Sequence, residues 1–441
     1  MRARLQPNAL MTQAVPNIAV ASGPVLALES RFLDAQQSIE AWLRREWAQT
    51  TAPFYCSVDL RNAGFKLAPV DTNLFPAGFN NLNPNFDSLC LQALQTAVER
   101  TCPTAAKLVL VPENHTRNRF YMESVARLKG LLERAGFEIR VGSISPEIAE
   151  PMTLELDSGA SLTLEPLERS GDRLHIGRFS PCAVVLNNDL SGGVPDILRD
   201  VVQPLLPPAE VSWAQRLKSQ HFAHYREVTR EFAEHIGIDP WLITPGFRNC
   251  GNVNFLKREG EDCLAANVEG LLEEIRAKYA EYGITNDPFV VVKADAGTYG
   301  MGVMTAKHPD ELRQLNRNMR KKMASAKGGG EVTGAIIQEG VYTFETIGEP
   351  AAVAEPVVYM IDHHVVGGFY RVHEGRGNDE NLNAPGARFH QLAFADPGVA
   401  PDSTCPPDDT PNRFYAYGVV ARLAMLAAAR EIRSTAHEAA A

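Results

Sequence analysis

Lys293 is the residue whose type and position most clearly indicate chemistry. It follows the uncharged run 289–292, which reads Phe-Val-Val-Val, and it precedes glycines at positions 297, 300 and 302. A lysine at the end of a buried strand needs an anionic partner, because an unpaired buried charge is costly. Closely spaced glycines let backbone N–H groups approach phosphate oxygens. The stretch therefore predicts a strand, a glycine-rich loop and a second strand from Val303, with a phosphate group as the anion.

The order of the lysine and the glycines separates this stretch from three known phosphate-binding motifs. A Walker loop has its lysine after the glycines, and a protein kinase has its glycine loop before its lysine. A dinucleotide fingerprint has the spacing G-x-G-x-x-G, whereas this chain has G-x-x-G-x-G. Lysine first and glycine hairpin second resembles the ATP-grasp enzymes, in which the two together clamp the phosphates of ATP. The alternative is an ordinary hairpin with a solvated lysine.

A second set of polar residues follows three apolar strands in the N-terminal half. Two of these strands are the runs 108–111 and 183–186. In an open α/β sheet, ligands bind beyond the carboxyl ends of the strands. We expect one cleft lined by Asp71, Asn73, Asn80, Glu113, Asn114, Arg117, Asn187, Asn188 and Asp189. The alternative is that these residues simply form turns, as Asn and Asp often do.

Alternating helix and strand patterns position these residues and predict an α/β chain that is α+β in part. Apolar residues near helical spacing predict helices over 27–47, 213–236, 309–323 and 414–432. The proline-rich stretch 204–208 indicates a domain boundary. We expect a disordered tail over 1–22, a substrate-binding α/β domain over 23–208 and a nucleotide-binding domain over 209–441.

Composition excludes several classes of protein. The 441 residues carry a formal charge of −10, and a nucleic-acid-binding domain needs a basic face. A positive pocket for ATP remains possible on an acidic protein. None of the seven cysteines form C-x-x-C, which indicates reduced thiols in the cytoplasm. No apolar run reaches membrane-span length, and prolines interrupt the apolar N-terminal stretch, so we expect neither membrane insertion nor a signal peptide.

The C-terminal half, from about residue 210 to 435, resembles an ATP-grasp fold in the order of its parts. The resemblance implies that phosphates are held by Lys218, Lys293, Gly297, Gly300 and Gly302. It implies that Arg371 steadies the transferred phosphoryl group and that the strand end 338–341 binds adenine through Gln338, Glu339 or the Val341 backbone. It also implies Mg²⁺, with the ligand candidates Glu355, Glu380, Asn381 and Asn383. The Glu-x-Asn metal signature usual in that fold is absent near the end of this chain.

Three longer motifs narrow the resemblance. They are DLRNAGFK at 59–66, PVDTNLFPAGFNNL at 69–82 and KADAGTYGMG at 293–302. These motifs look like the proteobacterial glutamate–cysteine ligase family of ATP-grasp type, over nearly the whole chain after residue 25. The family's fold implies a Rossmann-like pre-ATP-grasp domain with a parallel sheet, followed by an ATP-grasp domain. Its activity implies that ATP turns the glutamate γ-carboxylate into an acyl phosphate, which the cysteine amine attacks in the first step of glutathione synthesis.

The resemblance leaves individual substrate contacts to be predicted from residue type. Arg117 or Arg61 is a candidate to pair with a substrate carboxylate in forked geometry, and His115 is a candidate proton relay. We expect catalysis from Lys293, Arg371 and Arg117. We expect substrate binding by Asp71, Asn73, Asn80, Glu113, Asn114 and Asn188.

Two rival functions remain open at this point. The same fold could join a different amino acid and amine, or the protein could be a regulatory module that binds ATP without catalysis. Polar clusters in both halves favour an enzyme, because a nucleotide sensor needs no second polar cleft. The oligomeric state stays open, a homo-oligomer included.

Overall fold

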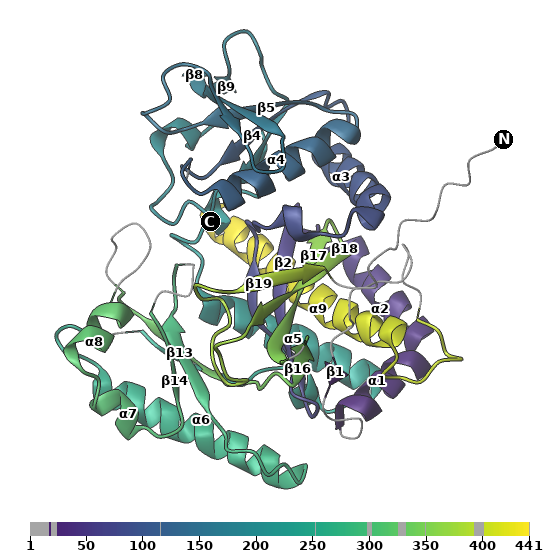
Figure 1. Ribbon diagram of the computed structural model, residues 1–441, viewed down its shortest axis with the longest axis vertical. Coiled ribbons are helices and arrows are strands. Elements are labelled where there is room, and N and C mark those ends of the chain that lie inside the picture. Colours follow the sequence, from purple (N-terminus) through teal and green to yellow (C-terminus); the bar gives the residue numbers. More distant parts are fainter. Residues whose placement is uncertain are drawn as a thin grey trace.

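The computed structural model describes residues 17–18, 24–114, 116–251, 253–297, 302–324, 332–348, 350–391 and 401–440. Three sheets of four or more strands organise this part of the chain. They form an upper, a central and a lower lobe in Figure 1. The expected mixed α/β class is confirmed.

A seven-stranded antiparallel sheet forms the central lobe, and its path runs β1, β16, β17, β18, β19, with β2 paired to β17 and β3 paired to β2. The strands are β1 (Asn17–Ile18), β2 (Tyr55–Asn62), β3 (Leu67–Asn73), β16 (Glu345–Ile347), β17 (Ala352–Ile361), β18 (His364–His373) and β19 (Arg388–Gln391). Residues from both sides of position 208 therefore pair directly in this sheet. The domain bounds 23–208 and 209–441 stay a prediction, and so does the disordered tail over 1–22, in which Asn17–Ile18 are the described residues and pair with β16.

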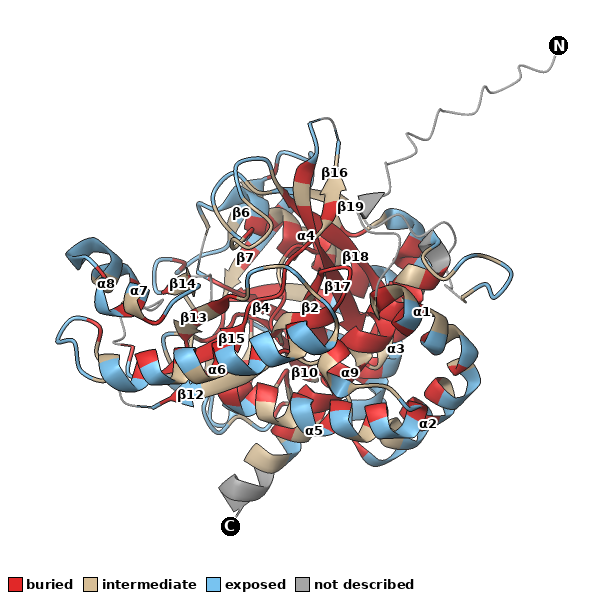
Figure 2. Cartoon of the chain, turned by 90° about the horizontal axis from the view of Figure 1, so that it is seen from below, coloured by how far each residue is buried: buried red, intermediate tan, exposed pale blue. Residues whose placement is uncertain are grey.

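A long buried helix, α9 (Thr410–Ala440), packs against this sheet through β2, β3, β17 and β18. Its side chains Ala421, Ala424 and Ala428 are fully buried, and such small residues let the helix lie close to the strands. Figure 2 shows α9 as a largely buried helix inside the molecule. The expected helix 414–432 is thus confirmed and is longer than predicted.

Three further helices cover α9 and the central lobe: α1 (Pro24–Asp34), α2 (Gln36–Gln49) and α5 (Lys218–Ile236). The helix predicted over 27–47 is two helices, separated at Ala35. The helix predicted over 213–236 begins only at Lys218, because the Asp295 carboxylate accepts the Ser219 backbone N–H at 2.7 Å and so caps the helix there.

The upper lobe contains a six-stranded sheet in the order β11, β10, β4, β5, β7, β6, parallel except for β6. The strands are β4 (Lys107–Pro112), β5 (Glu138–Ser143), β6 (Met152–Glu155), β7 (Ser161–Pro166), β10 (Ala183–Asn187) and β11 (Leu205–Leu206). Helices α3 (Asp87–Thr101) and α4 (Arg119–Arg134) share an apolar core with this sheet, and β8 (Glu168–Ser170) pairs with β9 (Arg173–His175). Because β4 and β10 are parallel neighbours, their carboxyl ends lie at one sheet edge, as expected.

The lower lobe is a four-stranded antiparallel sheet in the order β12, β15, β13, β14. Its strands are β12 (Phe247–Cys250), β13 (Val290–Ala294), β14 (Val303–Ala306) and β15 (Ala335–Glu339). Helix α6 (Glu261–Glu281) packs on it, with buried and exposed residues alternating along its length in Figure 2. The predicted strand, loop and strand around Lys293 are confirmed, since Val292 pairs with Met304.

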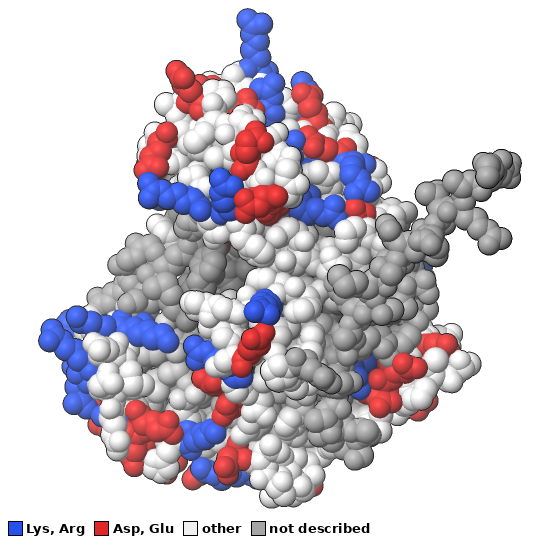
Figure 3. All heavy atoms as spheres, in the orientation of Figure 1, with Lys and Arg blue, Asp and Glu red and all other residues white. Residues whose placement is uncertain are grey.

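The helix predicted over 309–323 is two short helices, α7 (Asp310–Arg313) and α8 (Arg317–Met323). The side chain of Asn316 accepts the Met319 N–H at 2.9 Å, which starts a new helix there. Lys and Arg side chains gather over α8 at the lower left of Figure 3.

Two features bear on cellular context. In the part of the chain that the structure describes, no helix has both the length and the apolar character that crossing a bilayer requires. All seven cysteines are free thiols, as expected.

Candidate functional site

Two lysines from different elements meet beside Asp71. Lys293 lies on β13 and its ammonium donates to the Val70 carbonyl on β3 at 2.7 Å. Lys218 begins α5, and its Nζ lies 4.4 Å from the centre of the Trp213 ring. Burial, opposed by Asp71 and reinforced by Lys293, lowers the pKa of Lys218 to about 8. Burial also lowers the pKa of Lys293, again against the charge of Asp71. Both ammonium groups therefore lie within electrostatic range of one carboxylate, in a partly desolvated place where an anion would be strongly attracted.

Asp295 holds the two lysine-bearing elements together. Its carboxylate accepts the Ser219 hydroxyl at 2.6 Å as well as the Ser219 N–H at 2.7 Å, and its own carbonyl accepts the Lys218 N–H at 2.9 Å. The end of β13 is thereby tied to the first turn of α5. This residue was not predicted as part of the site, although it stands inside the KADAGTYGMG motif.

Two of the three predicted phosphate-loop glycines adopt backbone conformations that favour glycine. Gly297 has φ +91° and Gly302 has φ +64°. A Cβ at Gly302 would lie 3.1 Å from the Met323 carbonyl oxygen, so this position is also tightly packed. Gly300 lies outside the described residues, and so does His115.

The predicted adenine-binding strand end carries a carboxylate that is already paired. Glu339 Oε2 accepts Lys66 Nζ at 2.8 Å and the Gly246 N–H at 2.7 Å, and its Oε1 accepts the Trp241 indole N–H at 3.2 Å. Burial, opposed by Glu339, lowers the pKa of Lys66 to about 8. The Gln338 Nε2 atom, in contrast, is buried with no partner among the described residues. Adenine binding at 338–341 stays a prediction. Because the Glu339 carboxylate is already paired, the Gln338 side chain and the backbone are the groups left for it.

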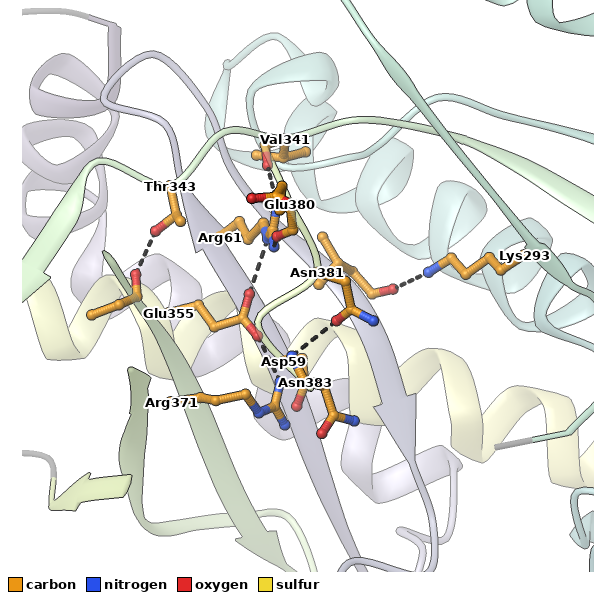
Figure 4. Close-up of polar contacts among 12 residues, drawn as sticks. Asp59, Arg61, Lys293, Val341, Thr343, Glu355, Arg371, Glu380, Asn381 and Asn383 are labelled. Atoms are coloured by element: carbon orange, nitrogen blue, oxygen red, sulfur yellow. Dashed lines mark hydrogen bonds and ion pairs between the residues drawn. The ribbon is translucent and has the colours of Figure 1, made fainter. Parts of the chain in front are cut away.

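A buried cluster of two arginines and two carboxylates lies on the central sheet (Figure 4). Glu355 receives Arg61 Nε at 3.0 Å on one oxygen and Arg371 Nη1 at 2.6 Å on the other. Arg371 Nη1 also contacts Asp59 Oδ2 at 2.7 Å, and burial raises the pKa of Asp59 even against that positive charge. The Arg371 Nε atom is buried and has no partner among the described residues. The Nη1 atom of Arg371 is thus held by two carboxylates, and its Nε atom can still donate a hydrogen bond to a ligand.

Arg61 links this cluster to the loop that carries the predicted metal ligands. It donates to the Val341 carbonyl at 3.1 Å and to the Glu380 carbonyl at 2.5 Å. On the same loop, the Asn381 side chain accepts the Asn383 N–H at 2.9 Å. The Glu380 carboxylate is held by Arg376 at 2.8 Å and by the Gly377 N–H at 2.7 Å. The structure therefore brings Glu355, Asn381 and Asn383 into one region (Figure 4) and turns the Glu380 carboxylate to Arg376.

A cavity of about 240 Å³ opens between the central sheet and the upper lobe. Arg371 and Asn383 line it together with three carboxylates, those of Asp59, Asp71 and Asp189. Its apolar lining comes from Phe75, Phe120, Trp213, Val357, Tyr359, Phe369 and Phe389. The volume, the charges of both signs and the apolar wall suit a molecule of amino-acid size that carries an ammonium and a carboxylate group.

Only part of the predicted polar cleft lines this cavity. Asp71, Asn73 and Asp189 do. Asn187 instead donates to the Pro76 carbonyl at 2.8 Å, Asn188 donates to the Pro112 carbonyl at 3.1 Å, and Glu113 accepts the Asp189 N–H at 3.2 Å. These three side chains hold the loops together, as the turn-forming alternative predicts.

The other predicted cleft residues lie around this cavity rather than in its lining. Asn114 and Arg117 lie exposed on the loop after β4. The Asn80 Oδ1 atom and the neighbouring Asn81 Nδ2 atom are buried without partners among the described residues, and Asn81 lines the cavity. Substrate binding by Asn80, Glu113, Asn114 and Asn188, and catalysis by Arg117, stay predictions.

A buried network of side chains adjoins the cavity, and the sequence patterns did not indicate it. Trp213 lines the cavity and donates to the Asn73 side chain at 3.2 Å. Arg216 lies against the Trp213 ring at 5.0 Å and donates to the Thr72 carbonyl at 2.6 Å. The Arg216 guanidinium in turn pairs with Glu431 of α9 at 2.8 and 3.0 Å. Asp59 is the first residue of the DLRNAGFK motif, whereas Trp213 and Glu431 stand in no motif, and Glu431 sits in an alanine-rich helix that offers no signal of a role.

Comparisons with known proteins give a consistent result. The family model described as "GshA: Glutamate-cysteine ligase" matches residues 29–432. A crystal structure of a protein from Methylobacillus flagellatus KT, named "Putative gamma-glutamylcysteine synthetase", is 58% identical, with a TM-score of 0.89 over 96% of this chain and 99% of that chain. No curated protein matches.

Two other solved structures align weakly. They are D-alanyl-alanine synthetase A from Vibrio cholerae, at 12% identity and a TM-score of 0.32 over 73% of this chain and 81% of that chain, and a glutathione synthetase-like effector from Globodera pallida, at 10% identity and a TM-score of 0.35 over 83% and 84%. Scores this low carry no argument.

Proposed function

The chain belongs to the glutamate–cysteine ligase family, and from that premise we propose how it performs the ligation. ATP phosphorylates the glutamate γ-carboxylate, and the cysteine amine then attacks the resulting acyl phosphate. The nucleotide binds between the lower and central lobes, and glutamate occupies the cavity above the central sheet. A cytoplasmic location is part of this proposal.

The observation that carries the proposal is the place of Asp71. It lines the cavity, and it lies within electrostatic range of both Lys218 and Lys293. The proposed site for phosphate groups and the proposed site for an amino acid would therefore be neighbours. This neighbourhood is what transfer of a phosphoryl group to a substrate carboxylate requires, because the reacting atoms must be held in contact.

The fold that we propose is an ATP-grasp fold with a Rossmann-like domain before it. The four-stranded sheet would supply the lysine and glycine hairpin, and the central sheet would supply Arg371 and Glu355. The parallel strands β5, β4 and β10 would form the Rossmann-like part. The opposing positions of Lys293 on one sheet and Arg371 on another support a clamp of this kind.

Mg²⁺ fits the donor set in the cluster around Glu355. This buried carboxylate and the amide oxygens of Asn381 and Asn383 are hard oxygen ligands, and each Glu355 oxygen receives a single arginine hydrogen bond. Mg²⁺ is commonly held by one or two carboxylates together with substrate phosphates. When bound, the ion would neutralise phosphate charge during transfer.

The protein's own residues have separate roles in the two steps. Lys218 and Lys293 bind phosphate oxygens, and Arg371 stabilises the charge on the transferred group. A γ-carboxylate oxygen bonds to the γ-phosphorus while the bond to ADP breaks. The cysteine ammonium then loses a proton, for which the cavity carboxylate Asp59 is the acceptor in place, while Asp71 pairs with the glutamate ammonium group. The amine attacks the acyl carbon, the bond to phosphate breaks, and the leaving phosphate takes up the second proton that the nitrogen gives up as the amide forms.

Product analysis tests this mechanism. With glutamate, ATP and Mg²⁺, hydroxylamine should replace cysteine as nucleophile and yield γ-glutamyl hydroxamate and ADP. Omitting glutamate should abolish both products. AMP and pyrophosphate would indicate an adenylate and would refute the acyl phosphate. ADP formation that requires a different amino acid would overturn the substrate, and ADP formation that needs no amino acid would favour a non-ligase role.

A further inference from the structure

We propose that Cys250 and Cys263 form a redox-active thiol pair that exchanges with small disulfide molecules and closes a reversible internal disulfide. Their Sγ atoms lie 3.1 Å apart, although both thiols are free. A disulfide bond is about 2.05 Å long, so the two atoms need to approach by about 1 Å. No step of the proposed ligase chemistry uses either thiol.

The two cysteines come from elements that a disulfide would link usefully. Cys250 is the last residue of β12, and Cys263 lies in the first turn of α6. Between them along the chain, Asn254 and Glu259 exchange backbone hydrogen bonds of 3.0 and 3.1 Å.

The two thiols differ in accessibility, which assigns them different roles in exchange. Cys263 is exposed, whereas Cys250 is buried in the apolar core of the lower lobe. Burial, reinforced by the neighbouring thiol, raises the pKa of Cys250 to about 12. Since the thiolate is the nucleophile in disulfide exchange, the exposed Cys263 attacks an external molecule first and Cys250 acts second.

The exchange balances in two steps. The Cys263 thiolate attacks one sulfur of a small disulfide RSSR, the S–S bond breaks, and RS⁻ leaves and takes up a proton. Cys250 then loses its proton to water and attacks the Cys263 sulfur, which expels the second RS⁻. Two protein thiols are oxidised, and one RSSR is reduced to two RSH.

The pair is joined to the candidate nucleotide site by one neighbouring residue. Asn249, adjacent to Cys250, donates to Ser219 Oγ at 3.0 Å and to Asp295 Oδ2 at 3.4 Å. Those are the residues that cap α5 and set the position of Lys218. A bond at Cys250 would therefore restrain the strand end that supports this cap.

Mass spectrometry with 2-hydroxyethyl disulfide tests the proposal without any ligase substrate. The full-length protein should lose two hydrogens in mass and yield a cross-linked pair of peptides that contain Cys250 and Cys263, and a dithiol reductant should reverse this. Cys250→Ser should instead stop at a stable hydroxyethylthio adduct on Cys263. Cys263→Ser should leave Cys250 unmodified over the same time.

Controls keep the result interpretable. Cys182→Ser removes a partly exposed thiol outside the pair and should leave the cross-link unchanged. Cys250→Ala gives a second version of the buried substitution if serine disturbs the core, and each variant is compared with the parent by circular dichroism. A lasting adduct on Cys263 of the unmodified sequence, or oxidation of Cys250 in Cys263→Ser at the parent rate, would overturn the proposal.

Discussion

Replacing Glu431 by glutamine should destabilise the protein much more than loss of an ordinary surface carboxylate. Glu431 and Arg216 form a bidentate pair with side chains 6% and 2% exposed. Glutamine keeps the shape of the side chain but removes the charge, so Arg216 is left buried with the Thr72 carbonyl and a neutral amide as partners. Breaking a buried ion pair from one side typically costs about 3–5 kcal/mol.

The pKa of Glu431 gives an independent value for the folding free energy that this ion pair contributes. Burial opposes ionisation, but Arg216 and His221 outweigh it and lower the pKa of Glu431 from its ordinary 4.5 to about 2. Since a tenfold change in proton affinity is worth about 1.4 kcal/mol, this drop corresponds to about 3 kcal/mol of folding free energy. Because the folded-state pKa is the lower one, this contribution is complete above pH 4.5 and is lost as the pH falls toward 2.

Urea unfolding of matched variants measures the effect. Glu431→Gln should lose about 3 kcal/mol at neutral pH. The matched variant is Glu231→Gln, which removes a partner of Arg430, the neighbour of Glu431 on α9. Glu231 is 37% exposed and Arg430 keeps Glu46, so a loss of about 1 kcal/mol or less in the free energy of unfolding is expected. The deficit of Glu431→Gln should shrink as the pH is lowered below 4.5. Equal losses in the two variants, or a deficit that does not change with pH, would refute the reasoning.

Four further predictions concern the candidate site. Lys293→Met should lower turnover by ~10²–10³ with the fold intact, since one preorganised charge contact is lost; normal turnover would contradict the phosphate role. Asp71→Asn should raise the KM for glutamate about 10- to 100-fold but leave reaction with glutarate, which lacks the ammonium group, unchanged; equal losses would exclude an ammonium contact. Gly302→Val should cost about 1–3 kcal/mol in stability, because its φ of +64° is strained for valine; an unchanged Tm would contradict this. Chelation of Mg²⁺ should stop ADP formation and re-addition should restore it, and activity that survives chelation would remove the metal from the proposal.

Local patterns predicted the elements around Lys293 well. The run of valines, the glycines and the second apolar run lie within about fifteen residues of one another, and the hairpin of β13 and β14 forms as expected. The exact start of α5 could not be predicted in the same way. Asp295 caps this helix from 76 residues away in sequence, and helical spacing carries no information about such a cap.

The sequence predicted which kinds of residue occur in the candidate site better than it predicted how these residues are arranged. Asp71 and Asn73 line the cavity and Arg371 joins them there, as polar residues of the expected kinds. Asn187 and Asn188 occur in an equally polar loop, yet their side chains are used to hold other loops. A turn-forming asparagine and a ligand-binding asparagine look alike until the neighbouring loops are in place.

The sequence by itself determined the chemistry available to this protein: a strand lysine before a glycine hairpin, arginines among carboxylates, and the motifs of a glutamate–cysteine ligase. The tertiary structure decided which of these groups face a ligand and which face one another. Glu355 joins Arg61 across 294 residues because their strands β17 and β2 pair in one sheet, and Glu339 of the four-stranded sheet pairs with Lys66 of the β2–β3 turn across 273 residues. A buried charge needs a partner of opposite charge. The spacing of residues along the sequence does not show which residue the fold brings next to it.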